Sequence, residues 1–265
     1  MFIKLVNLWI ILSITEYTVN AMHVNRGKIM RKYWKTARSD PYPKPLRALH
    51  NPQLFSGDIF RYRRFEARNA VPYTYWLWPK GEIPYLIDPS LEKHKGLILD
   101  SMNQFSQHTC IKFRERLSDD KHYLRIFKGS GCYATIGKDE DNPEMVSLGE
   151  GCYFSGTIVH ELMHTVGFYH EQNRSDRDDY ITIHWQNINE LYNEEFKKLR
   201  PEENQILTPF DYNSIMLYGP LSFSKDGQSM TMQPKHEGFT MKEVYDKPGL
   251  TAMDAKAINL LYKCP

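Results

Sequence analysis

The sequence lacks any apolar run long enough to cross a bilayer, which takes about 20 residues in a helix. Its N-terminal apolar stretch, Leu5–Ile14, spans ten residues and follows a positive charge at Lys4. Small residues then precede Met22, at the last and third-last positions of 1–21. This order is typical of a signal peptide. The sequence therefore predicts a signal peptide over 1–21, a secreted extracellular product and no membrane anchor, with a buried N-terminal helix or strand as the alternative.

Cysteine is also sparse. The four cysteines are separated by 22, 20 and 112 residues, so no short Cys-x-x-Cys step is present. This spacing argues against a zinc site built from cysteines. An even number of cysteines in an exported chain predicts two disulfides, and three pairings are open at this point. The residues are Cys110, Cys132, Cys152 and Cys264.

Net charge is small, at +2, but it hides an asymmetry. Residues 22–68 carry twelve Lys and Arg against three Asp and Glu, whereas residues 69–265 carry 21 against 28. A basic arm could bind nucleic acid or an anionic surface. An exported chain meets little nucleic acid, however, and the arm contains no recognisable nucleic-acid-binding module. We therefore expect no nucleic-acid partner and an arm attracted to the acidic remainder of the chain.

Regular periodicity is absent from the arm, and prolines interrupt it at Ser39–Pro45, so we expect an extended conformation there. From Trp78 onward the composition is that of a globular domain without internal repeats. The mixture of elements predicts a single α+β domain. Apolar patterning predicts strands at Ile83–Ile87, Ile111–Arg114 and Tyr123–Phe127, and helices at Lys93–His108, Thr157–Phe168 and Ala252–Leu261.

One motif carries the chemistry, with the sequence HELMHTVGFYHE at 160–171. Side chains four residues apart share a helix face, so His160 and His164 can bind one metal ion. Gly167 can adopt a left-handed conformation that ends the helix and brings His170 back as a third ligand. Three neutral imidazoles suit zinc and leave a position for water, as in catalytic sites. The motif therefore predicts one Zn²⁺ per chain.

Glu161 follows the first of these histidines directly. A carboxylate beside the open position can take a proton from zinc-bound water and pass it to the leaving amine. The sequence thus predicts hydrolysis of a peptide bond by Glu161-assisted attack of that water.

The twelve-residue motif matches the long zinc motif of the metzincins, and the run HEQNRSDRDDYITIHWQNI that starts at His170 resembles the astacin family of zinc metalloendopeptidases. The resemblance extends from Phe55 to Cys264. It implies a two-lobed metzincin (zincin-like) fold, with a twisted upper sheet, an active-site helix and an irregular lower lobe. It also implies an endopeptidase that acts on extracellular proteins, with a protein or peptide as substrate partner.

Further residues receive roles from this resemblance. Ser214–Tyr218 resembles the family's Met-turn, in which Met216 would form an apolar floor under the metal. Tyr218 would bind zinc until substrate arrives and then hydrogen-bond the oxyanion, a role that is electrostatically reasonable. The family usually has His before this tyrosine, whereas this sequence has Leu217, which affects local hydrogen bonding but not the ligand set.

A prosegment is implied as well. Phe55–Asp58 resembles a short prosegment motif whose aspartate binds zinc, so Asp58 would keep a propeptide, 22–68, inhibitory toward a protease domain at 69–265. A trypsin-like protease would cut between Arg68 and Asn69, and an earlier convertase cut after Arg64, at the end of the basic stretch Arg61–Arg64, would give an intermediate. The new terminal ammonium would be buried beside Glu171.

The resemblance also selects the disulfides, Cys110 with Cys264 and Cys132 with Cys152. Substrate would extend along an edge strand near Cys132–Ala134 by backbone hydrogen bonds. Separately, Asn173 begins an Asn-x-Ser sequon and is a candidate glycosylation site.

Two other functions remain open. An inactive zinc-binding interaction module would use the histidines but would not need Glu161 or an inhibitory prosegment. A zinc hydrolase acting on esters or other amides would use the same site, and only an assay on protein substrates separates it from a peptidase.

Overall fold

The computed structural model describes residues 42–60, 76–139, 142–201 and 205–265. The predicted signal peptide, residues 22–41 of the propeptide and both expected cleavage sites lie outside these ranges. The described residues belong to one structural unit, Tyr42–Pro265. Within it, no helix combines the length and apolar character needed to cross a membrane.

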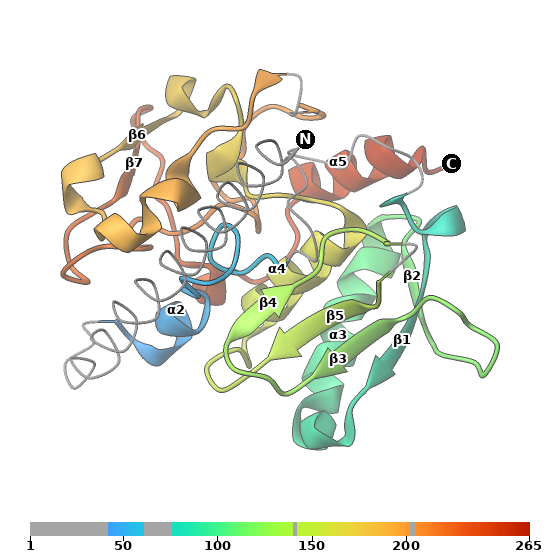
Figure 1. The fold of residues 1–265 in the computed structure, drawn as a ribbon. Helices are drawn as coiled ribbons and strands as arrows, with labels where there is room; N and C mark the ends of the chain where they lie inside the picture. The colour runs from blue at the N-terminus through green and yellow to red at the C-terminus, as the bar shows by residue number, and fades with distance from the viewer. Residues whose placement is uncertain (1–41, 61–75, 140–141, 202–204) are drawn as a thin grey trace, which may run out of the picture. The chain divides into compact units, whose positions relative to one another are not determined.

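A five-stranded sheet forms from residues 82–148 (Figure 1). Its order is β2-β1-β3-β5-β4, and only the edge strand β4 runs antiparallel to its neighbour. The predicted first three strands form within a residue of their expected positions, whereas β5 was not predicted. The strands are β1 (Glu82–Ile87), β2 (Lys112–Glu115), β3 (Leu124–Phe127), β4 (Cys132–Ala134) and β5 (Glu144–Leu148).

Two long helices, α3 (Lys95–His108) and α4 (Ser155–Val166), pack against each other behind this sheet in Figure 1. α3 buries one face, through Ile98, Ser101, Met102 and Phe105, at the predicted helical spacing. α4 contacts β4 and β5, and every residue from Gly156 to Val166 is buried. A helix buried on all sides lies in the interior of the domain, and this one carries the histidine motif.

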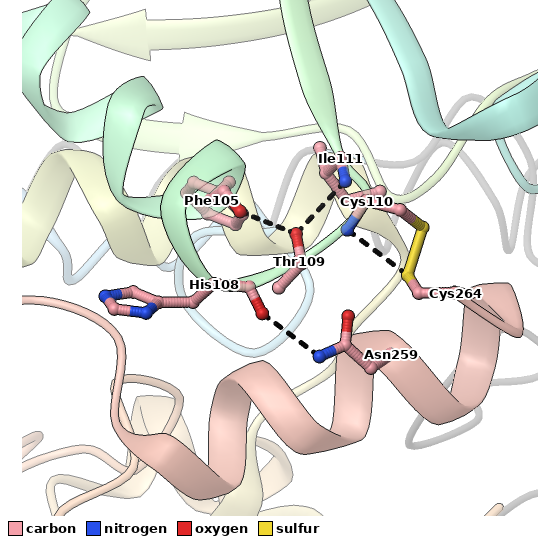
Figure 2. The surroundings of a disulfide bond; sticks show 7 residues. All are labelled: Phe105, His108, Thr109, Cys110, Ile111, Asn259 and Cys264. Carbon is pink, nitrogen blue, oxygen red and sulfur yellow. Dashed lines mark hydrogen bonds between the residues drawn. A yellow bond between two sulfur atoms is a disulfide. The ribbon is translucent and has the colours of Figure 1, made fainter.

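The C-terminal helix α5 (Ala252–Tyr262) begins with a capping box formed by Thr251 and Asp254. Just beyond it, a disulfide joins Cys264 to Cys110, in the segment between α3 and β2 (Figure 2). The Asn259 amide also donates to the His108 carbonyl at 3.0 Å. The second disulfide joins Cys132 of β4 to Cys152, shortly before α4. The structure thus contains both pairings that the family resemblance implied.

Apart from α5, the described residues after Gly167 have little regular structure, as expected for the lower lobe. Its strands β6 (Ile181–Ile183) and β7 (Met232–Pro234) form an antiparallel pair. Among the described residues, 3₁₀ helices also form at Glu171–Asn173, Arg177–Asp179, Trp185–Asn187, Glu190–Phe196 and Val244–Asp246, and before Gly167 at Pro79–Gly81 and Pro89–His94.

The described part of the predicted propeptide, 42–60, which we call the prosegment, is not extended throughout, so that expectation was wrong. A short helix, α2 (Lys44–Ala48), buries Leu46 and Ala48. Pro45 lies in its first turn, where a proline is tolerated because the missing amide hydrogen has no partner there. Periodicity could not predict a helix this short, because five residues make little more than one turn.

The last prosegment residues pair with the sheet edge. Ala134 of β4 donates its backbone amide to the Asp58 carbonyl at 2.9 Å, and its carbonyl accepts from the Phe60 amide at 2.8 Å. Ile59 and Ala134 form a parallel bridge. The prosegment therefore occupies the strand edge at which we expected the substrate.

Candidate metal centre

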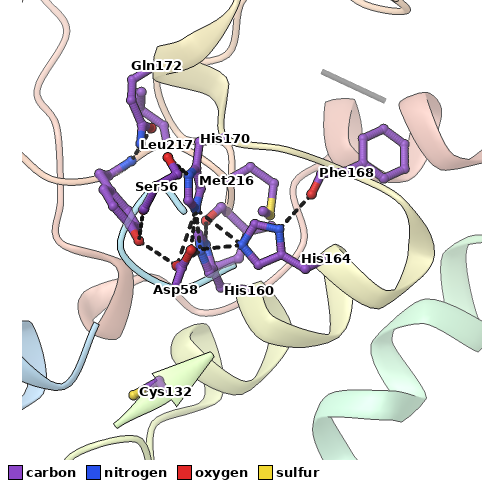
Figure 3. A network of polar contacts seen from close by, with 12 residues as sticks. Ser56, Asp58, Cys132, His160, His164, Phe168, His170, Gln172, Met216 and Leu217 are labelled. Carbon is purple, nitrogen blue, oxygen red and sulfur yellow. Dashed lines mark hydrogen bonds and ion pairs between the residues drawn. The ribbon is translucent and has the colours of Figure 1, made fainter. Parts of the chain in front are cut away.

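Three histidines converge at the end of α4 and the turn after it (Figure 3). His160 and His164 lie one helical turn apart, with ring centroids 4.9 Å from each other. Gly167 ends the helix in the left-handed conformation, with φ 118° and ψ 20°, as predicted. The chain then returns and brings His170 Nε2 to 3.2 Å from Nε2 of each of the other two rings.

The imidazole rings of His160 and His164 are each oriented by a hydrogen bond of Nδ1, the nitrogen that does not face the cluster. His160 Nδ1 lies 2.7 Å from the Ile215 carbonyl, and His164 Nδ1 lies 2.6 Å from the Phe168 carbonyl. A carbonyl can only accept, so both Nδ1 atoms carry the proton and both Nε2 atoms present a lone pair. Hydrogen bonds of this kind fix the orientation of metal-binding histidines.

The third ring is oriented by the prosegment. Ser56 Oγ donates to Asn173 Oδ1 at 3.0 Å and lies 2.7 Å from His170 Nδ1. Because the single hydroxyl proton is used toward Asn173, Ser56 accepts from His170, whose Nε2 is then also a lone-pair donor. No motif in the sequence indicated this role of Ser56.

Asp58 completes a buried four-residue cluster, whose ligand atoms all lie within 4.8 Å of one another. Its Oδ2 is 3.0 Å from His160 Nε2, and its Oδ1 is 3.1 Å from His170 Nε2. Nitrogens bound to zinc at about 2.0–2.1 Å in tetrahedral geometry are roughly 3.3 Å apart, close to the observed spacing. Lone pairs gathered this closely repel each other unless a cation lies between them, so the cluster fits one Zn²⁺.

Tyr218 contacts the same carboxylate. Its hydroxyl donates to Asp58 Oδ2 at 2.5 Å, and its ring packs against that of His170 with the ring centroids 4.4 Å apart. Figure 3 shows Met216 beside the histidines, as the Met-turn resemblance implied. Leu217 is fully buried, and its carbonyl accepts a hydrogen bond from Lys247.

Two charged residues from the C-terminal region, Lys247 and Asp254, hold the turn at Ser214–Tyr218, and no motif in the sequence marked them. Asp254 accepts from Ser214 Oγ at 2.7 Å and from the Ile215 amide at 2.9 Å. Lys247 donates to the Ser214 carbonyl at 2.7 Å. Both side chains are buried, so these hydrogen bonds compensate for their loss of water.

Glu161 is fully buried, and neither of its carboxylate oxygens has a hydrogen-bond partner. Burial raises the pKa of Glu161 well above its ordinary value, and the charge of Asp58 adds to this effect. A buried carboxylate without a partner costs stability, so its presence points to chemistry. A raised pKa suits a group that must take and return a proton near neutral pH.

Glu171 borders a cavity of about 30 Å³ that is also lined by Asp211, Ser214 and Asp254. Its Oε1 accepts from Arg174 Nη1 at 2.8 Å and from the Asp211 amide at 3.2 Å. Burial is the main cause that raises the pKa of Glu171 to about 7. The cavity is large enough for water and gathers three carboxyl groups.

Asn173, the candidate glycosylation site from the sequon, lies buried in this fold. The side chain is buried, and its amide donates to the carbonyls of Glu195 and Lys197, both at 2.8 Å. A glycan on this nitrogen would be buried and would disrupt both hydrogen bonds.

A central helix with His-Glu-x-x-His, a third histidine after a glycine turn and a mostly parallel sheet define a zinc metalloprotease of the zincin-like fold. Residues 70–263 match the family model described as Astacin, which is a peptidase family. The chain therefore belongs to the astacin family, whose activity depends on zinc, and the predicted family, fold class and cofactor are confirmed.

Individual relatives agree. The chain is 42% identical over 231 residues to astacin-like metalloprotease toxin 1 of Loxosceles intermedia, and the match covers 86% of each protein. It is 43% identical over 199 residues to zinc metalloproteinase nas-15 of Caenorhabditis elegans, covering 74% of this chain but 34% of that one. Among solved structures, high choriolytic enzyme 1, a hatching enzyme zinc-protease from Oryzias latipes, is similar with a TM-score of 0.68 and 33% identity, covering 74% of this chain and 100% of that one.

Proposed function

We propose that this chain is the latent precursor of a secreted endopeptidase that hydrolyses extracellular proteins, with residues 1–21 as signal peptide, 22–68 as propeptide and 69–265 as protease domain. The observation that carries the proposal is the buried cluster itself. Three histidines of the protease domain converge with Asp58 of the prosegment, and the unpartnered Glu161 follows one of them. An inactive binding module would gain nothing from a buried carboxylate without a partner.

His160, His164 and His170 would hold the zinc, which when bound supplies a Lewis acid that polarises the scissile carbonyl and makes water easier to deprotonate. Glu161 accepts the proton of the attacking water and then delivers it to the leaving amine. The Tyr218 hydroxyl already donates to an oxygen of Asp58 at 2.5 Å. With Asp58 gone, the same hydroxyl can donate to the oxyanion that develops on the substrate.

Latency follows from the position of the prosegment. Asp58 takes the place that a substrate oxygen or water would need among the histidines. Two residues later, Phe60 hydrogen-bonds to β4 at Ala134, so the substrate edge is also occupied. Asp58 would thus be a zinc ligand of the precursor alone, and the propeptide would be an inhibitor in cis.

Activation would require a trypsin-like cut between Arg68 and Asn69, with an earlier convertase cut as an intermediate. The start of the family match at residue 70 supports a domain boundary there. The cavity beside Glu171 supports burial of the new terminal ammonium, because three carboxyl groups, of Glu171, Asp211 and Asp254, line it. The one cation in the same lining, Arg174, is also paired with Asp176 outside it. Secretion is supported by the predicted signal peptide and by the two disulfides, which persist in oxidising compartments.

Replacing Glu161 tests the enzymatic proposal. The full chain would be expressed, cleaved to the protease domain and assayed for zinc content and for hydrolysis of protein and ester substrates. Glu161→Gln should keep about one zinc per chain while turnover of protein falls by roughly 10²- to 10⁴-fold. Near-normal peptidase activity in this variant would rule out the proposed role of Glu161. Zinc binding without cleavage of protein by the parent would instead favour an interaction module or an esterase.

A further inference from the structure

An apolar cluster separate from the main core lies where the prosegment meets the protease domain. Ile59, Tyr169 and Leu199 are buried in it, and Phe55 and Ile136 pack against them. Two of the five side chains belong to the prosegment and three to the protease domain. We call the three residues of the domain, Ile136, Tyr169 and Leu199, the flanking pocket.

The flanking pocket adjoins the metal cluster along the chain. Tyr169 directly precedes the ligand His170, and Ile136 lies two residues after Ala134, which pairs with the prosegment backbone. Its main occupant, Ile59, directly follows Asp58. A side chain next to the group that reaches the metal therefore enters the pocket.

The walls of the pocket are held by hydrogen bonds that do not involve the prosegment. Beside Ile136, the Gly137 amide donates to the His164 carbonyl at 3.0 Å. The Leu199 amide donates to the Asn173 carbonyl at 2.7 Å. Both bonds remain when the prosegment leaves, so the pocket should persist in the cleaved enzyme with its apolar surface exposed to water.

The prosegment side chains in the flanking pocket, Ile59 and Phe55, indicate which substrate side chains it could bind. Ile59 is completely buried, and the Phe55 ring meets the Tyr169 ring edge to face at 6.2 Å. An apolar surface next to a catalytic site regains favourable burial when it binds another apolar side chain. A charged substrate side chain would be desolvated there without an opposite charge in the cluster.

We propose that the flanking pocket is a specificity pocket that binds an aliphatic or aromatic substrate side chain next to the scissile bond. This inference rests on the proposed function, because it requires that the prosegment be removed and that a peptide take its place. The prosegment then acts as a template for the substrate: Asp58 lies at the position of the reacting group, and Ile59 at the position of its neighbour.

Cleavage profiling tests the inference. The activated enzyme would be given a proteome-derived peptide library, and residues on both sides of each cut would be counted. We expect Ile, Leu, Val or Phe to be enriched at one position adjacent to the bond, on whichever side the substrate direction selects. Cleavage with no apolar preference at either adjacent position would overturn the inference and leave the proposed function standing. No hydrolysis of protein by the zinc-loaded, cleaved chain would overturn both.

A variant identifies the pocket. Leu199→Arg should lower kcat/KM for a peptide with Ile at the enriched position by about 10- to 100-fold, the value of one buried aliphatic side chain. It should raise the rate for Asp or Glu at that position. The matched control is Leu117→Arg, because Leu117 is 59% exposed and should tolerate a charge. An unchanged preference in folded Leu199→Arg would contradict the assignment.

Inhibition by prosegment peptides tests the same pocket and does not require that the Leu199→Arg variant fold. A synthetic peptide of residues 51–60 should inhibit the activated parent enzyme, and the same peptide with Ile59→Gly should inhibit about 10- to 100-fold more weakly. A Gln53→Ala peptide is the control, since Gln53 is exposed. Equal inhibition by the parent and Ile59→Gly peptides would show that Ile59 does not fill a binding pocket.

Discussion

The metal cluster is built by two regions that differ in how firmly they are attached. α4 is buried from Gly156 to Val166, and its histidines are oriented by carbonyls of the protease domain itself. The prosegment reaches the same cluster with one carboxylate. Backbone hydrogen bonds to β4, the contact of Ser56 with His170 and the buried side chains of Leu49 and Ile59 hold it in place. Under the proposed function, the first region is the permanent site and the second is a cover that activation removes.

Removing the metal should have the largest effect, and the rate of zinc loss should distinguish the contribution of the domain's histidines from that of the prosegment. A chelator should abolish proteolysis by the cleaved enzyme, and added zinc should restore it, because three histidines of the domain suffice as ligands. The intact precursor should release zinc at least about tenfold more slowly, since Asp58 adds a ligand and covers the site. Zinc transfer to a coloured chelator measures both rates. Equal rates would mean that the prosegment does not bind the metal.

Replacing Tyr218 should have the second-largest effect on activity. Tyr218→Phe removes a hydroxyl that donates to Asp58 in the precursor and, in our account, to the oxyanion in the cleaved enzyme. Steady-state kinetics should show kcat reduced by about 10²- to 10³-fold with KM nearly unchanged, because only the transition state loses the hydrogen bond. An unchanged kcat would remove Tyr218 from the catalytic residues.

The prosegment should also bind less well in acid, because of His50. This ring is buried, stacks on Phe223 with centroids 4.2 Å apart, and has an Nδ1 without a hydrogen-bond partner. Burial lowers the pKa of His50 from 6.5 to about 3, despite the opposing charge of Asp58. A released prosegment therefore takes up a proton below pH 6.5 that the docked one excludes. Docking is strongest above pH 6.5 and weakens by up to about tenfold per unit as the pH falls toward 3.

Inhibition of the cleaved enzyme by a synthetic segment 42–60 measures this dependence. The inhibition constant should rise by about tenfold between pH 7.5 and 5.5. His50→Phe keeps an aromatic ring against Phe223 but cannot take up a proton, so its pH dependence should be smaller by that factor. The same pH dependence in both segments would assign it to other groups.

Exposed ion pairs between the prosegment and the domain should contribute least to docking of the prosegment. In the described part of the chain, the prosegment and the domain share an exposed ion pair between Lys44 and Glu150, at 2.7 Å. Exposed pairs contribute little because water and salt screen them. Lys44→Ala should weaken docking of segment 42–60 by no more than about fivefold, and less at high salt. A larger loss would restore the basic arm as a main source of latency.

The sequence was most informative where chemistry and local geometry coincide. The His-Glu-x-x-His spacing and Gly167 predicted the helix, its left-handed end and three converging imidazoles, because each depends on neighbouring residues. The contacts of Ser56, Lys247 and Asp254 were not predictable, since they join residues tens to hundreds of positions apart without a motif. β5 was missed because a short buried strand has no clear alternation. Burial of Asn173 likewise depends on long-range packing.

The most direct measurement of the central claim is the activity of an uncleaved precursor in which Asp58→Ala has removed the carboxylate. Mass spectrometry would verify that the chain is intact, and Gln53→Ala, at an exposed prosegment position, would serve as the control. We expect Asp58→Ala to hydrolyse protein without cleavage, at a fraction of the rate of the mature enzyme, because Phe60 still pairs with β4. The control should stay silent. An Asp58→Ala precursor that is folded, zinc-loaded and fully silent would contradict the account.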